Sequence, residues 1–182
     1  MKAIILLSGG IDSMACLNFY IQQKYDVECI FYDYGQPAVE LEFNSALKIA
    51  DYFKVPLFSY EINGLSIPQK GEICGRNALL SIYTLSLNKY SSYKIIIGIH
   101  SGTTYPDCSQ NFVKQMNKVI DCYGNGKIVL EAPFISWSKA DIVSYCKNAA
   151  LPISLTYSCE SGKNPPCGQC LSCLDRKELL DE

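Results

Sequence analysis

KAIILLSGGIDS, residues 2–13, joins a short apolar run to a turn rich in serine and glycine. The run is β-branched and apolar, which is typical of a buried strand, and the spacing of later apolar residues indicates a helix over residues 12–24. The two glycines let the backbone turn with its N–H groups pointing inward, and Ser8 and Ser13 add hydroxyl donors. The helix N-terminus adds partial positive charge. The stretch therefore predicts a strand, an anion-binding loop and a helix in succession.

The alternative interpretation of SGGIDS is an ordinary glycine turn followed by a capped helix. The stretch is not a Walker loop, because no Gly-Lys-Ser or Gly-Lys-Thr sequence closes it. Its position directly after the first strand favours phosphate binding, since the N-terminus of a helix in this position is a ready anion site.

Strands and helices alternate along most of the chain, and the strands are nearly continuous apolar runs. This pattern predicts an α/β fold with a doubly wound, mostly parallel sheet that is covered on both faces. Ligands of such sheets bind beyond the carboxyl ends of the strands. We expect one ATP-binding α/β domain over residues 1–150 and a metal-stapled tail over residues 151–182 packed on it. Further strands are predicted at residues 27–34, 57–62, 94–99 and 127–131, and further helices at residues 38–53, 77–90, 110–122 and 139–148.

Composition excludes several functional classes. The chain has 182 residues, a formal net charge of −2 and no basic block, so it lacks the electrostatic footprint of a nucleic-acid partner. The apolar run at the N-terminus is too short for a signal peptide, and no stretch has the length of a membrane span. Isolated cysteines in apolar segments, such as Cys16 and Cys146, behave as small hydrophobes. We therefore expect a cytoplasmic protein without a membrane partner.

Four of the ten cysteines are grouped near the C-terminus with the spacing of a metal site. Cys159 is followed by Cys167, Cys170 and Cys173, so that two consecutive C-x-x-C steps let thiolates converge on one tetrahedral ion. Four protein ligands leave no position for water, which predicts a structural zinc rather than a catalytic one. An iron–sulfur cluster uses the same ligands and is the main alternative, ahead of a redox pair or structural disulfides.

SGGIDS resembles the pyrophosphate loop of the ATP pyrophosphatase (PP-loop) superfamily, whose members cleave ATP between the α- and β-phosphates. The resemblance implies a fold of the adenine nucleotide alpha hydrolase-like (HUP) type and ATP as co-substrate. Asp12 would then orient donors or help to hold magnesium, which prefers oxygen ligands. APFISWSKADI, residues 132–142, is similar to a later superfamily segment in which Lys139 would reach a phosphate. Without the resemblance, Lys139 is an ordinary solvated lysine in the first turn of a helix.

The order of the motifs is more specific than any one of them. It is similar to the 7-cyano-7-deazaguanine synthase family of the queuosine pathway, in collinear order over nearly the whole chain. The resemblance implies an ATP-dependent C–N ligase that adenylates 7-carboxy-7-deazaguanine and releases pyrophosphate, after which ammonia displaces AMP to give an amide. A second activation then gives the nitrile, and the resemblance also implies a homodimer. The motifs are SGGIDS (8–13), FYDYGQ (31–36), GRN (75–77), YPDC (105–108), SWSKAD (136–141) and CGQCLSC (167–173).

The resemblance also assigns roles to single residues. Arg76 would clamp a carboxylate or a phosphate, although it is otherwise a surface arginine at a helix start. Tyr105 would stack on a planar base and Asp107 would accept from its amino edge, whereas the alternative for both is a turn with a helix cap. The catalytic residues would be Asp12, Arg76 and Lys139. The ATP site would comprise Leu7, Ser8, Gly9, Gly10, Ile11, Asp12, Ser13, Phe31, Arg76 and Lys139. The substrate site would comprise Tyr34, Gln36, Asn77, Tyr105 and Asp107.

Two loops depart from the family pattern. Residues 61–74 replace a longer excursion, and residues 100–104 lack the acidic residue that usually precedes Tyr-Pro-Asp. Both loops border the expected acceptor site, so a larger amine, on a protein for example, is an alternative to ammonia. A non-catalytic nucleotide sensor is a second alternative, against which the intact motifs argue. A sulfur-transferring relative is a third, and the acidic pI speaks against it.

Overall fold

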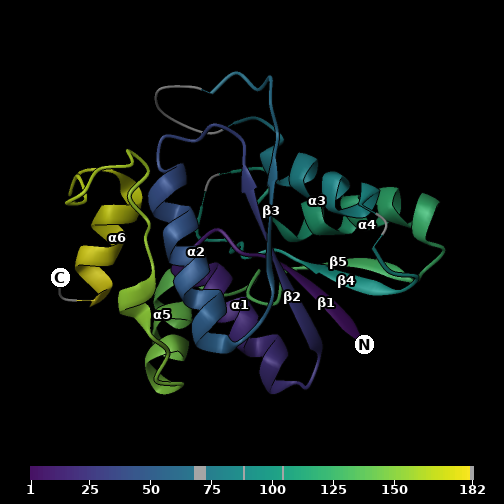
Figure 1. Cartoon of the computed structure of the whole chain (residues 1–182), viewed down its shortest axis with the longest axis horizontal. Coiled ribbons are helices and arrows are strands. Elements are labelled where there is room, and N and C mark those ends of the chain that lie inside the picture. Colours follow the sequence, from purple (N-terminus) through teal and green to yellow (C-terminus); the bar gives the residue numbers. More distant parts are fainter. Residues whose placement is uncertain (68–72, 88, 104, 181–182) are drawn as a thin grey trace.

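Apolar β-branched runs form the centre of the molecule, and the helices between them cover it (Figure 1). The computed structural model describes residues 1–67, 73–87, 89–103 and 105–180. The strands are β1 (Lys2–Leu6), β2 (Asp26–Asp33), β3 (Leu57–Glu61), β4 (Tyr93–Ile96) and β5 (Ile128–Glu131). The helices are α1 (Ile11–Gln22), α2 (Val39–Phe53), α3 (Arg76–Ser86), α4 (Gln110–Gly124), α5 (Lys139–Asn148), the short 3₁₀ helix η1 (Ile153–Leu155) and α6 (Leu171–Leu180).

The five described strands form one parallel sheet in the order β3-β2-β1-β4-β5, which confirms the expected doubly wound fold. β1 lies in the middle and pairs with β2 through Lys2 and Asp26 and with β4 through Lys2 and Tyr93. The strand order reverses between β1 and β4. Loops that leave the carboxyl ends of these two strands therefore diverge, and ligands bind in the crevice that this leaves.

Alternation along β1 assigns its side chains to two separate cores. Ala3 and Ile5 belong to a cluster with residues of α1, α2 and α5, whereas Ile4 and Leu6 belong to a second cluster with residues of α3 and α4. Because successive strand side chains point to opposite faces, a strand that is apolar at every position needs helices on both. Figure 1 shows these two helix layers on either side of the sheet.

Several boundaries differ from the sequence-based expectation. The fourth strand ends at Ile96 rather than at residue 99, because Gly98 packs against the start of α1, although Ile97 still donates to Glu131 O. The third long helix begins at Arg76 and ends at Ser86 instead of covering residues 77–90, of which residue 88 lies outside the described residues. Within α2, Leu47 is 43% exposed, whereas its neighbour Ala46 is fully buried.

The C-terminal tail is more regular than its Pro-, Gly- and Cys-rich sequence indicates, since α6 occupies its last part. It is tied to the sheet domain at several points. The Tyr157 N–H donates to Gly9 O (3.0 Å), and a Cβ on Gly162 would lie only 2.1 Å from Pro37 O. Lys147 of α5 donates to Leu179 O of α6 (3.0 Å), and within the tail Arg176 donates to the Thr156 hydroxyl (2.8 Å). The tail therefore packs directly on the loop that follows β1.

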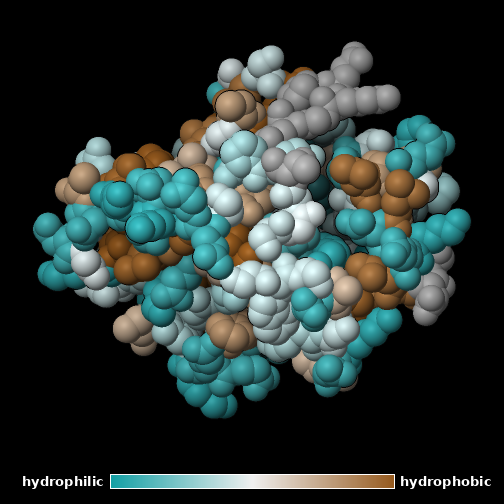
Figure 2. Space-filling view, turned by 180° about the vertical axis from the view of Figure 1, so that it is seen from behind, coloured by the Kyte–Doolittle hydropathy of each residue, from teal (hydrophilic) through white to brown (hydrophobic). Residues whose placement is uncertain are grey.

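The surface seen from behind mixes residues of all hydropathies, and its hydrophobic areas are separated by hydrophilic and intermediate ones (Figure 2). Leu171 and Leu174 of α6 are among the exposed large hydrophobic residues. Among the described residues, no helix combines the length and the apolarity that crossing a bilayer requires.

A buried ionic cluster lies near the N-terminal ends of β1 and β2, at the end of the sheet opposite the loop that follows β1. The Glu28 side chain is only 2% exposed and lies 3.1 Å from Lys89 Nζ and 3.5 Å from Lys2 Nζ. The Tyr90 hydroxyl donates to the same carboxylate (2.6 Å). A buried carboxylate is tolerated only with such partners, because desolvation of an unpaired charge costs several kcal/mol.

We expect Glu28→Ala to lower the free energy of unfolding by about 3 kcal/mol, because it leaves two lysines without their buried partner. Urea unfolding followed by circular dichroism measures this change. Asp26→Ala is the matched control: Asp26 also pairs with Lys2, but its side chain is 76% exposed, so the loss should stay below about 1 kcal/mol. Equal losses in the two variants would contradict a special role of the buried carboxylate.

Candidate functional site

The loop after β1 has the geometry of an anion cradle. Gly10 is the N-cap of α1, and no side chain among the described residues caps the first N–H groups of that helix. Ser13 Oγ donates to Gly10 O (3.0 Å) and lies 3.2 Å from Ser8 Oγ, so both hydroxyls are held at the helix start. Uncapped N–H groups with adjacent hydroxyls are the donors that a phosphate requires.

Two close backbone approaches hold this loop in position. A Cβ on Gly98, two residues beyond the end of β4, would lie 2.8 Å from the Ser13 nitrogen. Gly9 has φ +84°, and a Cβ there would lie 2.4 Å from Glu42 O of α2. Glycine is required at both positions, since any side chain would push the loop away from the sheet or from α2.

Asp12 and Lys139 form an ion pair at the edge of the cradle. Lys139 Nζ donates to both carboxylate oxygens of Asp12, at 2.7 and 2.8 Å, and both side chains are partly exposed. Lys139 begins α5, whose N-cap is Ser138: the Ser138 hydroxyl accepts from the Asp141 N–H, and the Asp141 carboxylate accepts from the Ser138 N–H in return. The Ser138 hydroxyl (2.7 Å) and the Ser138 N–H (2.9 Å) both donate to the Asp141 carboxylate and lower its pKa. The structure thus brings two of the three predicted catalytic residues together.

Arg76 lines the same cavity as that pair and begins α3. Its guanidinium donates to the Tyr34 hydroxyl (3.5 Å) and to Asn77 Oδ1 (3.3 Å). Burial raises the pKa of Tyr34, and the charge of Arg76 opposes that rise. Asn77 is itself buried and donates through its side chain to Asp107 O (3.4 Å). Arg76 is therefore a partly buried, oriented cation rather than a free surface arginine.

Gln36 has its hydrogen-bonding groups occupied by the protein. Its Oε1 accepts from the Tyr34 N–H (2.9 Å), and its Nε2 donates to Tyr32 O (3.1 Å) and to Glu42 Oε2 (3.1 Å). Both amide hydrogens are used in this way. Glu42 lines the cavity, and burial raises the pKa of its carboxyl, against the opposing effects of Gln36 and Arg76.

Two predicted substrate residues, Tyr105 and Asp107, do not line the cavity. Asp107 is buried, and its Oδ2 accepts from the Asn77 N–H (3.1 Å), so it caps the start of α3. Tyr105 is partly buried against the core on the α3–α4 face. The alternative interpretation of Tyr-Pro-Asp, a turn with a cap of the following helix, agrees only in its turn, in which the Cys108 N–H donates to Tyr105 O (3.0 Å). The cap of the following helix α4 is Ser109, and Asp107 caps α3 instead. His100 is also buried, and its Nδ1 accepts from the Gly102 N–H (3.1 Å).

A cavity of about 290 Å³ joins these parts at the carboxyl ends of β1, β2 and β4. Sequence reasoning missed part of its wall. Two of these residues could have been found from the sequence. Glu42 stands six residues after Gln36, the last residue of the motif FYDYGQ, and Gly98 directly follows an apolar run. The tail residues Tyr157, Ser158, Glu160 and Ser172 had no such signal. Of the predicted ATP and substrate residues, Leu7, Ser8, Gly10, Ile11, Asp12, Ser13, Phe31, Tyr34, Gln36, Arg76, Asn77 and Lys139 line it.

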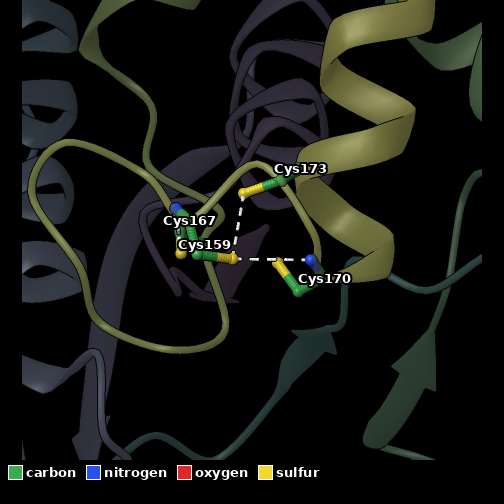
Figure 3. A group of neighbouring side chains, drawn as sticks. All are labelled: Cys159, Cys167, Cys170 and Cys173. Carbon is green, nitrogen blue, oxygen red and sulfur yellow. Dashed lines mark hydrogen bonds between the residues drawn. The ribbon is translucent and has the colours of Figure 1, made fainter.

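The four C-terminal cysteines converge on one point (Figure 3). Their sulfur atoms all lie within 4.8 Å of one another, and the Sγ atoms of Cys167 and Cys173 are 3.9 Å apart. The N–H groups of Gln169 and Cys170 donate to Cys167 Sγ and lower its pKa to about 6. Thiolates are the form that binds metals. The donor set and its spacing therefore fit a single metal ion with four sulfur ligands.

The family model described as queuosine biosynthesis protein QueC matches residues 2–71 and 66–182. A 7-cyano-7-deazaguanine synthase from Pseudoalteromonas atlantica is 31% identical, and the alignment covers all of this chain and 94% of that protein. A 7-cyano-7-deazaguanine synthase from a Sulfurihydrogenibium species is 35% identical over 98% of this chain and 94% of its own. The alignment to the Pseudoalteromonas protein extends over 211 residues, although this chain has only 182.

Solved structures of low sequence identity share the fold. An NMN synthetase from Francisella tularensis superposes with a TM-score of 0.55 at 16% identity, covering 85% of this chain and 63% of its own. The U34-tRNA thiolase NcsA from Methanococcus maripaludis, solved with its iron–sulfur cluster, gives 0.51 at 16% identity, covering 100% and 64%. At this identity the likeness concerns the arrangement of strands and helices.

Loss of one of the four clustered cysteines should destabilise the tail and, with it, the part of the cavity wall that the tail supplies. We expect Cys173→Ser to lose bound metal and to lower the melting temperature by about 5 °C or more, because a ligand of the folded state stabilises that state. Elemental analysis and thermal unfolding measure the two effects. Cys122→Ser, at an exposed cysteine outside the cluster, is the control and should retain metal and stability. Equal metal content in the two variants would contradict the assignment.

Proposed function

The chain belongs to the queuosine biosynthesis protein QueC family, and from this premise we propose that it converts 7-carboxy-7-deazaguanine to 7-cyano-7-deazaguanine with ATP and ammonia. It is an enzyme of the ATP-dependent ligase type. The observation that carries the proposal is the cavity itself, whose wall contains both the anion cradle and an oriented arginine.

The ATP half of the reaction rests on the loop after β1. The uncapped N–H groups of α1 and the hydroxyls of Ser8 and Ser13 would bind the pyrophosphate end of ATP. Lys139 would add a positive charge that its ion pair with Asp12 holds at the edge of the cradle. Magnesium bound with ATP would neutralise phosphate charge, and Asp12 offers it an oxygen ligand. No protein nucleophile is needed, because the residues position and screen charge.

Arg76 is the proposed clamp for the acid. An unactivated carboxylate and an amine form a salt at neutral pH, so the carboxylate oxygen must first be converted to a leaving group. The planar guanidinium of Arg76 would hold the carboxylate toward the α-phosphate, with its own orientation set by Tyr34 and Asn77. Ammonia would then displace AMP, and a second activation and dehydration would give the nitrile. Asn77 and Gln36 would act by positioning Arg76 and Glu42.

We further propose that the tail, residues 151–182, binds a structural zinc and packs on the ATP-binding domain of residues 1–150. A separation of 4.8 Å or less among all four sulfurs suits one ion. A four-iron cluster distributes its ligands over four metal atoms and needs a wider spacing. All ten cysteines lie in the described ranges and carry no disulfide, which suits a reducing compartment.

A second candidate function keeps the adenylation but uses a larger amine, for example one on a protein. The observation that favours it is chain length: the synthase of Pseudoalteromonas aligns over 211 residues against 182 here. The family model also matches in two segments that meet at residues 66–71, inside the shortened loop of residues 61–74. A shorter loop beside the acceptor site would leave more room for a bulky amine.

Mass spectrometry of the products tests the proposal. Metal-loaded protein is incubated with ATP, magnesium, 7-carboxy-7-deazaguanine and ammonium. We expect AMP, pyrophosphate and the nitrile. If AMP forms without nitrile, and a deazaguanine amide of an added amine appears, the acceptor is the larger amine and not ammonia. Absence of AMP would overturn the adenylation itself.

Lys139→Met should lower kcat/KM about 100-fold, because it removes a charge that stabilises the leaving pyrophosphate. Steady-state kinetics of AMP formation measures this change, and thermal unfolding shows whether the variant is folded. Lys114→Met is the control, since Lys114 is an exposed lysine on α4 and lies outside the cavity wall. An unchanged kcat/KM in Lys139→Met would remove Lys139 from the catalytic residues.

A further inference from the structure

Glu42 is an acidic residue in a cavity that is proposed to hold two anionic substrates, which calls for an explanation. A carboxylate near phosphates is unfavourable unless it serves a donor group. Its Oε2 accepts from Gln36 Nε2 (3.1 Å), and burial raises its pKa. Gln36 is in turn held by Tyr32 O and the Tyr34 N–H. The buried side chain of Gln36 therefore orients the Glu42 carboxylate.

Glu42 and Arg76 line the same cavity. Burial raises the pKa of Glu42, and the charge of Arg76 only partly opposes that rise. Within the described part of the chain, however, no ion pair of 4.0 Å or less joins the two side chains. Arg76 is directed instead to Tyr34 and Asn77. A cation and an anion that face one cavity without pairing present a donor fork and an acceptor to whatever is bound between them.

The proposed acid matches this arrangement in the order of its polar groups. On one side of a 7-carboxy-7-deazaguanine ring, the 7-carboxylate is followed by the 6-oxo group, then by the N1–H and then by the 2-amino group. The first two are acceptors, which suit a guanidinium. The last two are donors, which suit a carboxylate, because its two oxygens accept two parallel hydrogen bonds.

We propose that Glu42 is the specificity residue that reads the N1–H and 2-amino edge of the deazaguanine acid, while Arg76 holds the 7-carboxylate and the 6-oxo group. Gln36 is the positioning residue that fixes the Glu42 carboxylate. This assignment rests on the proposed function. In it, the N1–H and 2-amino edge of the acid is bound by a residue that lines the cavity. Tyr105 and Asp107, which lie outside the cavity wall, have no direct part in reading the base.

Adenine offers a similar donor, its 6-amino group, so the test must separate the two sources. Isothermal titration calorimetry is performed on the metal-loaded full chain with three ligands: the acid, its analogue lacking the 2-amino group, and α,β-methylene-ATP. We expect the wild-type protein to bind the acid about tenfold or more tightly than the analogue. Glu42→Gln should lose this preference, because the acid binds more weakly and the analogue changes less, while the affinity for α,β-methylene-ATP stays unchanged.

Two further variants control for folding and for charge on α2. Glu42→Asp keeps the carboxylate and should retain part of the preference, and Glu40→Gln, at an exposed position on the same helix, should behave as wild type. Unchanged discrimination in Glu42→Gln, with a melting temperature like that of wild type, would overturn the proposal. Weakened binding of α,β-methylene-ATP alone would assign Glu42 to adenine instead. If the wild-type protein bound α,β-methylene-ATP but not the acid, the proposed substrate would fail, and the role of Glu42 with it.

Discussion

The close packing of the loop after β1 is the constraint on which the rest of the site depends. This loop lies where the strand order reverses, with Gly98 of the β4 end on one side and the backbone of α2 on the other. Neither contact leaves room for a Cβ, so the donors of Ser8, Ser13 and the α1 N-terminus are held by backbone atoms. Donors fixed in this way need little reorganisation when a phosphate binds, which is the physical basis of electrostatic preorganisation.

The cavity beyond this loop is lined by paired and by unpaired charges. Lys139 and Asp12 form an ion pair at the starts of α5 and α1, whereas Arg76 at the start of α3 and Glu42 in α2 line the cavity without pairing with each other. Paired charges screen each other, and unpaired ones remain available to a ligand. In the proposed function, the unpaired charges would recognise the acid, and a single cavity would position both substrates for one transfer.

The tail connects the four-cysteine cluster to the loop after β1. The Tyr157 N–H donates to Gly9 O in the phosphate loop, two residues before Cys159. Ser158, Glu160 and Ser172, which lie next to the cluster cysteines in sequence, form part of the cavity wall. In the proposed function, a structural ion in such a position would contribute to catalysis indirectly, because folding of the tail would complete the wall that excludes water from the phosphates.

Local signals in the sequence determined the alternation of strands and helices, the parallel sheet, the phosphate loop and the four-cysteine cluster. In each case the chemistry is encoded within a few neighbouring residues, as in SGGIDS or in two successive C-x-x-C steps. Only the tertiary structure decided which side chains share the cavity. It placed Asp107 beneath α3 as a helix cap, occupied the Gln36 amide with protein partners, and brought Glu42 and Tyr157 to the cavity wall. Contacts of this kind join residues far apart in the chain, and strand order and helix packing, which no local pattern records, determine them.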